Sequence, residues 1–293
     1  MRIWLIKIGE PVPDGDGRHR LFRTGLIAQI LAERGHDVTW WTANFSHQEK
    51  RFVGTPDETR QLESNLRLIL LRSRGYSTNI SWERFADHIQ VAARFLKLAP
   101  SEPRPDVIAC SFPTVELAAA AVRWGRRNGV PVILDLRDLW PEVLLMHMPK
   151  SLRGPARLAI APYFALSEWA FKNADALYAI TPAFLQWGLD RASRPARETD
   201  RAFWLAYPDR EPSQAEIADA RAQWADRGVD LSSESFLACY FGSLSGTVDV
   251  HLLVRVAEIL KQRRSQVRIV ICGSGRLLAE LQMRAAELAS HLS

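Results

Sequence analysis

The chain has 293 residues, of which 47% are hydrophobic and 24% are charged, and its formal net charge is +5 at pH 7. This balance is typical of a folded globular protein with room for about two domains, and it excludes a disordered chain. A net positive charge favours anionic partners such as phosphates, but the basic residues are spread along the chain, so nucleic acid is not indicated as a partner.

Neither a leader peptide nor a membrane span is predicted. The opening MRIWLIKIGE is a short apolar run without a cleavage site, so it indicates a first strand. No apolar stretch approaches the ~20 residues that a spanning helix needs. Cys110, Cys239 and Cys272 each fall within an apolar run, which predicts buried reduced thiols rather than disulfides or a metal cluster. We therefore expect a cytoplasmic protein with no cofactor and no metal.

Strands and helices alternate through the first two-thirds of the chain. Apolar runs predict strands, and longer amphipathic segments predict helices. In chain order these are strand 2–8, helix 20–34, strands 37–42 and 65–71, helix 81–98, strand 106–111, helix 115–128, strand 130–135, helix 155–172, strand 176–181, a short helix from Pro182 and strand 202–207. This alternation predicts an α/β fold with a doubly wound parallel sheet.

A second, shorter α/β unit follows. A polar, Ala-rich stretch contains a predicted helix over 213–227, and from Phe236 the chain runs strand, glycine loop, helix, strand, glycine loop, helix. Such a unit is shorter than the ~100–150 residues of an independent α/β domain. We expect a Rossmann-like N-terminal domain over 1–207, a linker and helix over 208–234, and an incomplete Rossmann-like domain over 235–293. Its open sheet edges would favour self-association.

Ligands of open α/β sheets bind at the carboxyl ends of the strands, and the loop at 9–20 is the first candidate. Gly15 and Gly17 allow close backbone approach, and Arg18 and His19 place charge beside a helix N-terminus, as an anion site requires. A turn leading into a solvated basic helix start explains the same residues equally well. The loop lacks the G-x-G-x-x-G pattern, so a dinucleotide is not expected.

The second candidate is LDLRDLWPE at 134–142, where Asp135 and Asp138 flank Arg137. A carboxylate at this position can orient a hydroxyl or accept its proton, and an arginine can pair with a phosphate. Spacing alone favours a structural Asp–Arg pair, because ion-pair networks produce the same pattern.

The third candidate is a pair of glycine turns. GSLSG contains Gly242 and Ser243, and GSG contains Gly273, Ser274 and Gly275; each stands between a strand and a helix. Backbone amides in such turns can hold a phosphate or a nucleoside, although tight strand-to-helix connections would also need glycine.

Two basic amphipathic stretches, 81–98 and 144–172, could lie in a lipid interface. Helices that cover a sheet have the same pattern, and this alternative is favoured.

The order of several segments resembles one enzyme family. The segments are the glycine loop with Arg18 and His19, LAERGHDVTWWTANFSHQ (31–48), PDVIACSFPTVELAAA (105–120), VPVILDLRDLWPE (130–142), and the FGSLSG and ICGSG turns. In this order they resemble the family-four retaining glycosyltransferases of GT-B fold, in particular the WbuB/WcaI-like group. The resemblance covers nearly the whole chain but only the first three-quarters of the family pattern. The paired-glutamate donor motif and the C-terminal helix of such relatives lie beyond it.

The resemblance implies a function and a set of roles. A hexosyl or N-acetylhexosaminyl group would be transferred from a nucleotide sugar, such as a UDP-sugar, to a polyprenyl-linked or saccharide acceptor. The transfer would retain the anomeric configuration and need no metal. It would serve bacterial surface-polysaccharide synthesis at the inner-membrane surface. Asp138 would be catalytic. The acceptor side would comprise Gly15, Gly17, Arg18, His19, Asp135 and Arg137, and the donor side would comprise Gly242, Ser243, Gly273, Ser274 and Gly275.

Two alternatives remain open. The chain could be a truncated, catalytically inactive relative that serves as a binding module, or a sugar-nucleotide epimerase on the same fold.

Overall fold

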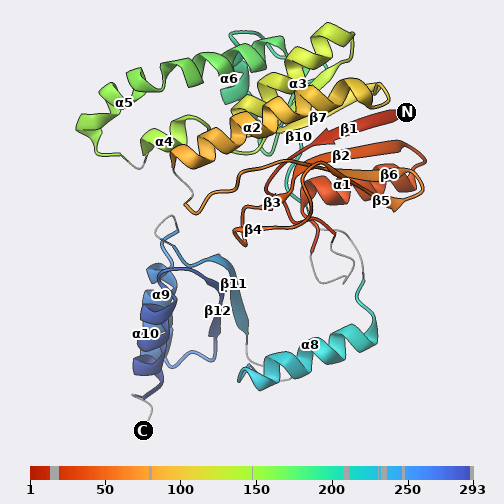
Figure 1. Ribbon diagram of the computed structural model, residues 1–293. Helices are drawn as coiled ribbons and strands as arrows, with labels where there is room; N and C mark the ends of the chain where they lie inside the picture. Colours follow the sequence, from red (N-terminus) through yellow and green to blue (C-terminus); the bar gives the residue numbers. More distant parts are fainter. Residues whose placement is uncertain are drawn as a thin grey trace. The chain divides into compact units, whose positions relative to one another are not determined.

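The computed structural model describes residues 1–13, 20–78, 81–146, 148–206, 211–229, 231, 236–245 and 248–290. The chain divides into two compact units, Met1–Tyr207 and Pro208–Ser293 (Figure 1).

Unit 1 is built on one twisted sheet. Its strands are β1 (Arg2–Ile6), β2 (Asp37–Ala43), β5 (Glu58–Glu63), β6 (Leu66–Leu71), β7 (Val107–Phe112), β8 (Val132–Leu136), β9 (Ala176–Ala179) and β10 (Arg201–Ala202). Their spatial order is β10-β9-β8-β7-β1-β2-β6-β5. The six strands from β6 to β9 are parallel and follow the doubly wound order, with its reversal between β1 and β7. The predicted α/β class with a doubly wound sheet is confirmed.

One strand departs from the parallel prediction. β5 pairs antiparallel with β6 at the edge of the sheet, so the sheet is mixed. Its sequence, ETRQLE, alternates between partly buried and exposed positions and lacks an apolar run. Charged side chains are typical of edge strands, where they discourage pairing with another chain. A second short antiparallel pair, β3 (Phe45–Ser46) with β4 (Arg51–Phe52), follows β2.

Helices cover both faces of this sheet (Figure 1). They are α1 (Arg23–Glu33), α2 (Trp82–Leu98), α3 (Val115–Asn128), α4 (Glu142–Met146), α5 (Arg153–Ala159), α6 (Ala161–Asn173) and α7 (Pro182–Ala192). The adjacent Trp40 and Trp41 are both fully buried, in two different core clusters, because successive strand residues point to opposite faces. Trp40 packs in the cluster that contains Ala28 of α1, and Trp41 packs with Phe95 of α2.

Two predicted elements of unit 1 were wrong in extent. The single helix expected over 155–172 is two helices, α5 and α6, which meet at Ile160. Pro162 stands in the first turn of α6, where its missing N–H costs no helical hydrogen bond, so it marks a helix start. The last strand, expected over 202–207, is only the two residues of β10, and Tyr207 lies outside the described residues.

Unit 2 begins with α8 (Gln214–Asp226), whose N-terminus is closed by a capping box between Ser213 and Glu216. β11 (Leu237–Ser243) and β12 (Arg268–Ser274) then pair in parallel, followed respectively by α9 (His251–Gln262) and α10 (Leu278–Ser290). Leu244, Val250 and Leu281 form its small buried core.

The prediction of three buried thiols was wrong for unit 2. Cys110 is buried, but Cys239 is exposed and Cys272 is partly exposed, although all three are free thiols. Tyr240 and Ile271 pack against the core of unit 2, and strand neighbours point to opposite faces, so both cysteines face away from that core. Across the described residues, no helix is long and apolar enough to cross a bilayer.

Candidate functional site

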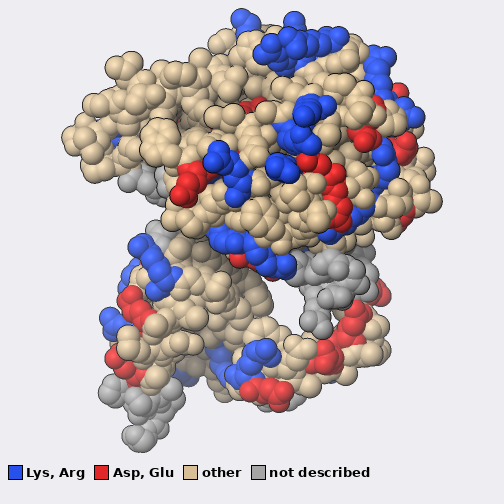
Figure 2. Space-filling model, viewed as in Figure 1, with Lys and Arg blue, Asp and Glu red and all other residues tan. Residues whose placement is uncertain are grey.

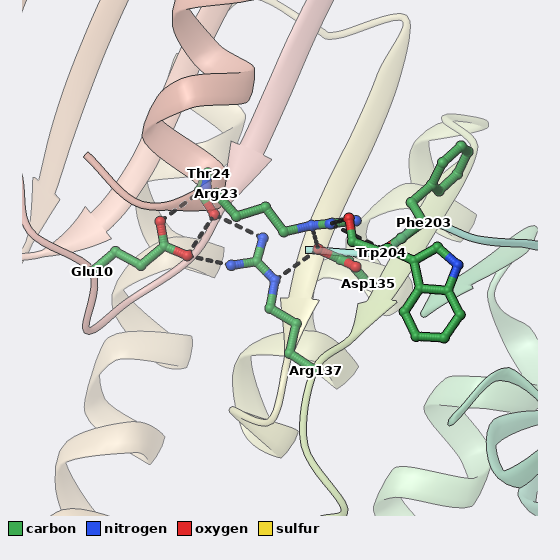
Figure 3. Close-up of polar contacts among 7 residues, drawn as sticks. All are labelled: Glu10, Arg23, Thr24, Asp135, Arg137, Phe203 and Trp204. Atoms are coloured by element: carbon green, nitrogen blue, oxygen red, sulfur yellow. Dashed lines mark hydrogen bonds and ion pairs between the residues drawn. The ribbon is translucent and has the colours of Figure 1, made fainter. Parts of the chain in front are cut away.

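Arg137 is the centre of a buried polar network at the carboxyl edge of the unit 1 sheet (Figure 3). It follows β8 directly, and its Nε donates to Asp135 Oδ2 at 2.7 Å. Its Nη2 donates to Thr24 Oγ1 at 3.0 Å, and its Nη1 pairs with Glu10 Oε1. One guanidinium therefore joins the loop after β8 to the loop after β1 and to the start of α1.

Glu10 also accepts hydrogen bonds from the first turn of α1. The N-cap position of that helix, Phe22, has no side chain that can accept a hydrogen bond. Thr24 donates to the Glu10 carboxylate from its backbone N at 2.9 Å and from its Oγ1 at 3.1 Å. A carboxylate at this position pairs an otherwise unused backbone N–H and interacts favourably with the helix dipole.

Arg23 completes the network on the other side. Its Nε donates to Asp135 Oδ2 at 3.2 Å, and its Nη1 reaches the carbonyl oxygens of Phe203 and Trp204 at 3.2 and 3.4 Å (Figure 3). The carboxylate of Asp135 is thus shared by two guanidinium groups. Arg23 and Arg137 together pair with two carboxylates, Asp135 and Glu10.

One acceptor in this network has no partner among the described residues. Asp135 Oδ1 is buried and receives no hydrogen bond there, although Asp135 Oδ2 receives two. Asp135, Arg137 and Tyr178 line a cavity of about 250 Å³ whose remaining wall is mostly apolar and comes from α1 and the adjoining strands. A hydroxyl group of a ligand could be oriented by this oxygen, since a buried acceptor favours a donor.

Asp138 does not belong to the network. Its side chain is exposed, and its Oδ1 accepts a hydrogen bond from the backbone N of Leu139 at 2.9 Å. The structure therefore brings Asp135 and Arg137 together and leaves Asp138 on the surface of the same loop. Gly15, Gly17, Arg18 and His19 lie outside the described residues.

Sequence reasoning missed Lys7, which follows β1 at the reversal point of the sheet. Burial, reinforced by the charge of Arg137, lowers the pKa of Lys7 to about 8, although Glu10 and Asp135 act in the opposite direction. Burial also raises the pKa of Cys110, on the neighbouring strand β7, to about 12. A lysine that interrupts an apolar strand run was the available signal. Glu10, Arg23 and Thr24 were missed because their partners are more than 100 residues away or across a loop.

The five predicted donor residues of unit 2 lie together. Gly242 is opposite Gly273 and Ser243 is opposite Ser274, at the carboxyl ends of two parallel strands. Gly242, Ser243, Gly273 and Ser274 are strand residues, and of the five only Gly275 stands in the connection to the next helix.

Close packing of the two strand ends explains two of these glycines without a ligand. A Cβ on Gly273 would overlap the Gly242 carbonyl oxygen, and one on Gly275, whose φ is +151°, would overlap the backbone of Leu244. The Leu244 N–H donates to the Ser274 carbonyl at 2.9 Å, and its own carbonyl accepts from Leu277 N at 3.1 Å. Gly242 faces only the hydroxyl end of Tyr240.

Within the part of the chain that the structure describes, no three His, Cys, Asp or Glu side chains gather in a way that could hold a metal ion.

Comparison with known proteins identifies relatives of this architecture. The family described as "Glycosyl transferase 4-like domain" matches residues 22–199, which is more than half of the chain. No curated protein matched the sequence.

Among solved structures, HepE (Alr3699) of Anabaena is similar over almost the whole chain. Its complex with UDP-glucose gives a TM-score of 0.54 and its complex with UDP gives 0.55, each at 14% sequence identity. The alignments cover 99% and 98% of this chain but 66% of HepE, so the chain spans less than two-thirds of that protein's length. At this identity the likeness shows a shared fold.

Proposed function

We propose, from the premise that the chain belongs to the glycosyl transferase 4-like domain family, that it transfers a sugar from a nucleotide-sugar donor to an acceptor held by unit 1. The donor is a UDP-sugar in this proposal. Support comes from the structural likeness to HepE, which was solved with UDP and with UDP-glucose.

The observation that carries the donor assignment is the in-register pairing of Gly242 with Gly273 and of Ser243 with Ser274. Nucleotides bind α/β domains outside the carboxyl ends of parallel strands, and both strand ends of unit 2 meet there. In this proposal the diphosphate is held by backbone N–H groups of the turns that follow these two strand ends.

Unit 1 supplies the acceptor side of the proposal. The acceptor is a polyprenyl-linked sugar or a saccharide of bacterial surface-polysaccharide synthesis, and the transferred hexosyl or N-acetylhexosaminyl group retains its anomeric configuration. Asp138 is the proposed catalytic carboxylate, because it is exposed while Asp135 is held by Arg23 and Arg137. Metal-free transfer, with basic and backbone N–H groups stabilising the departing diphosphate, is part of the same proposal.

We further propose that one end of unit 1 rests on the inner-membrane surface. Exposed apolar side chains gather over α4, α5 and their connection, where Figure 2 shows a broad area with few charged groups on the face in view; they are Met146, Met148, Leu152 and Leu158, with exposures of 53%, 38%, 55% and 78%. Lys150, Arg153 and Arg157 stand among them in the sequence. Apolar side chains with interspersed cations are typical of segments that lie in an anionic lipid interface.

The experiment is a transfer assay read by proton NMR on the purified chain. UDP-glucose, UDP-galactose and UDP-N-acetylglucosamine are each supplied with a short-chain prenyl-diphosphate-linked sugar, with and without EDTA. We expect release of UDP, a product with the donor's anomeric configuration, and the same rate in EDTA.

The other outcomes separate the alternatives. Heat of UDP binding in calorimetry without any transfer would favour the binding module. A sugar nucleotide that changes configuration without an acceptor would favour the epimerase. An inverted product would overturn the retaining mechanism, and the absence of UDP binding would overturn the proposal as a whole. Co-sedimentation with phosphatidylglycerol vesicles tests the proposed membrane contact of unit 1. The double variant Leu152→Asp/Leu158→Asp should no longer bind the vesicles.

A further inference from the structure

A second group of cationic and aromatic side chains lies apart from the Arg137 network. His47 and Lys50 come from the connection between β3 and β4, Tyr76 from the loop after β6, and Arg84 from the first turn of α2. These four residues, called the basic–aromatic cluster below, come from three separate segments of unit 1, and all four side chains are partly exposed.

Tyr76 is the centre of the cluster. Its hydroxyl lies 2.6 Å from His47 Nδ1, and Lys50 Nζ lies 3.4 Å from the same nitrogen. Lys50 Nζ stands 4.5 Å from the centre of the Tyr76 ring, and the Arg84 guanidinium stands 5.7 Å from it. Two cations therefore converge on one aromatic ring.

Arg84 is fixed from several sides. Its guanidinium lies 4.9 Å from the ring centre of Trp140, which follows β8, and its Nε lies 3.4 Å from His88 Nε2, one turn further along α2. Contacts with two aromatic faces and with His88 hold this guanidinium in place.

The charges that act on His47 are all positive. Burial and then Lys50, Arg84, His88 and Lys7 lower the pKa of His47 to about 4. Burial and then Arg84 also lower the pKa of Lys50. Like charges gathered this closely repel one another, and an anion bound between them would relieve that repulsion.

Among the described residues, Glu49 beside Lys50 pairs with Arg51, and two carboxylates of α2 and α3 are engaged with other groups. Asp87 Oδ1 accepts from Ser73 Oγ at 2.6 Å and from the backbone N of Arg74 and Gly75 at 2.6 and 3.2 Å. Glu116 Oε2 accepts from Tyr163 Oη at 3.0 Å and lies 3.6 Å from His88 Nδ1. Asp87 thus holds the loop that carries Tyr76, and Glu116 holds His88.

We infer that the basic–aromatic cluster is a binding site for a phosphate or diphosphate group, with Lys50 and Arg84 as its cations and His47 and Tyr76 as its hydrogen-bonding partners. A guanidinium and an ammonium around one anion, beside a histidine on which Lys50 and Arg84 both act as positive charges, are the recognition chemistry of a phosphate ester. The identification of that group as part of the acceptor rests on the proposed function, because unit 1 is the acceptor side there. The assignment of the cluster as an anion site does not rest on the proposed function.

The test compares the wild-type chain with the double variant Lys50→Gln/Arg84→Gln. Binding of inorganic pyrophosphate, farnesyl diphosphate, farnesol and phosphatidylglycerol vesicles is measured by calorimetry and co-sedimentation. Arg126→Gln/Arg127→Gln is the matched control, because it also removes two positive charges, from exposed residues in the last turn of α3. UDP binding and thermal unfolding report whether each variant is folded.

We expect the double variant to bind pyrophosphate and farnesyl diphosphate at least about tenfold more weakly than wild type, and the control to bind them as wild type does. Farnesol should bind neither protein measurably. In ¹⁵N-histidine spectra, pyrophosphate should raise the pKa of His47 above about 4, since a nearby anion favours the protonated ring.

Equal pyrophosphate affinity in wild type and double variant would overturn the inference, as would an unmoved His47 titration. Loss of vesicle binding with undiminished pyrophosphate and farnesyl diphosphate binding would assign the cations to a lipid headgroup and would also overturn it. If the chain binds pyrophosphate through the cluster but shows neither UDP binding nor transfer, the proposed function fails and the anion site stands.

Discussion

Arg137 and Asp135, two residues apart in the sequence, are joined side chain to side chain by a 2.7 Å hydrogen bond. Arg137 also pairs with Glu10, so one guanidinium joins two carboxylates whose side chains are only 10% and 5% exposed. Hydrogen bonds and opposite charge thereby compensate the cost of burying all three groups. The primary role of this pair is to fix the carboxyl edge of the sheet.

Replacing Arg137 should therefore destabilise the protein strongly. Arg137→Met leaves the Asp135 and Glu10 carboxylates buried without this partner, and we expect the free energy of unfolding of unit 1 to fall by about 3–5 kcal/mol. Urea unfolding followed by tryptophan fluorescence measures it. Arg126→Met, at an exposed position of α3, should change the value by less than about 0.5 kcal/mol. A loss below about 1 kcal/mol for Arg137→Met would contradict the structural role.

Asp138 should behave in the opposite way. Its carboxylate is exposed and bonds only its own loop among the described residues, so Asp138→Asn should leave the unfolding free energy within about 0.5 kcal/mol of wild type. If Asp138 is the catalytic carboxylate, the transfer rate should fall by about 10²–10⁴-fold. The measurement is initial-rate kinetics on a variant whose unfolding curve matches wild type. A wild-type rate would remove Asp138 from the catalytic role.

The sequence was sufficient to predict most of unit 1, because its parallel strands are buried on both faces and appear as continuous apolar runs. Val115–Asn128 is a helix at both predicted ends, with Gly129 in the left-handed conformation that closes it. β5 was not predicted because its charged residues sit at a sheet edge, where pairing with β6 rather than burial determines the strand.

The site was less predictable, because its contacts connect distant segments. The Asp135–Arg137 pair could be anticipated from a spacing of two. Nothing in the local pattern indicates that Glu10 and Thr24 meet the same guanidinium more than 100 residues away. The basic–aromatic cluster was missed for the same reason, since its three segments meet only once the sheet has formed.

The glycines of unit 2 can be tested by adding one methyl group. Gly273→Ala places a Cβ against the Gly242 carbonyl, so the two strand ends must separate, and we expect unit 2 to lose stability and UDP affinity together. Thermal unfolding and calorimetry with UDP measure the two effects. Gly154→Ala is the matched control, because its Cβ meets nothing within 4 Å and the helix α5 gains a better helix former.

That control should raise stability by about 0.5–1 kcal/mol. Undiminished UDP binding in Gly273→Ala would show that the strand ends can separate at little cost.

Lys7 should give the protein an alkaline rise in stability. Its pKa is lowered to about 8 in the folded chain from the ordinary lysine value of 10.5, so between those two pH values the unfolded chain holds a proton that the folded chain has lost. Stability rises with pH wherever the unfolded state binds more protons, so Lys7 contributes a rise from about pH 8 to about pH 10.5. Below pH 8 the charged ammonium is retained at a cost to the folded state.

Lys7→Met removes both the cost and the rise. We expect the variant to be more stable than wild type at pH 7, and the difference to shrink steadily as the pH approaches 10.5. Urea unfolding of both proteins at half-unit pH intervals isolates Lys7 from the other groups that titrate in this range. Lys97→Met, an exposed position in the last turn of α2, should give a difference that does not depend on pH. A pH-independent difference for Lys7→Met as well would mean that Lys7 titrates alike in the folded and the unfolded chain.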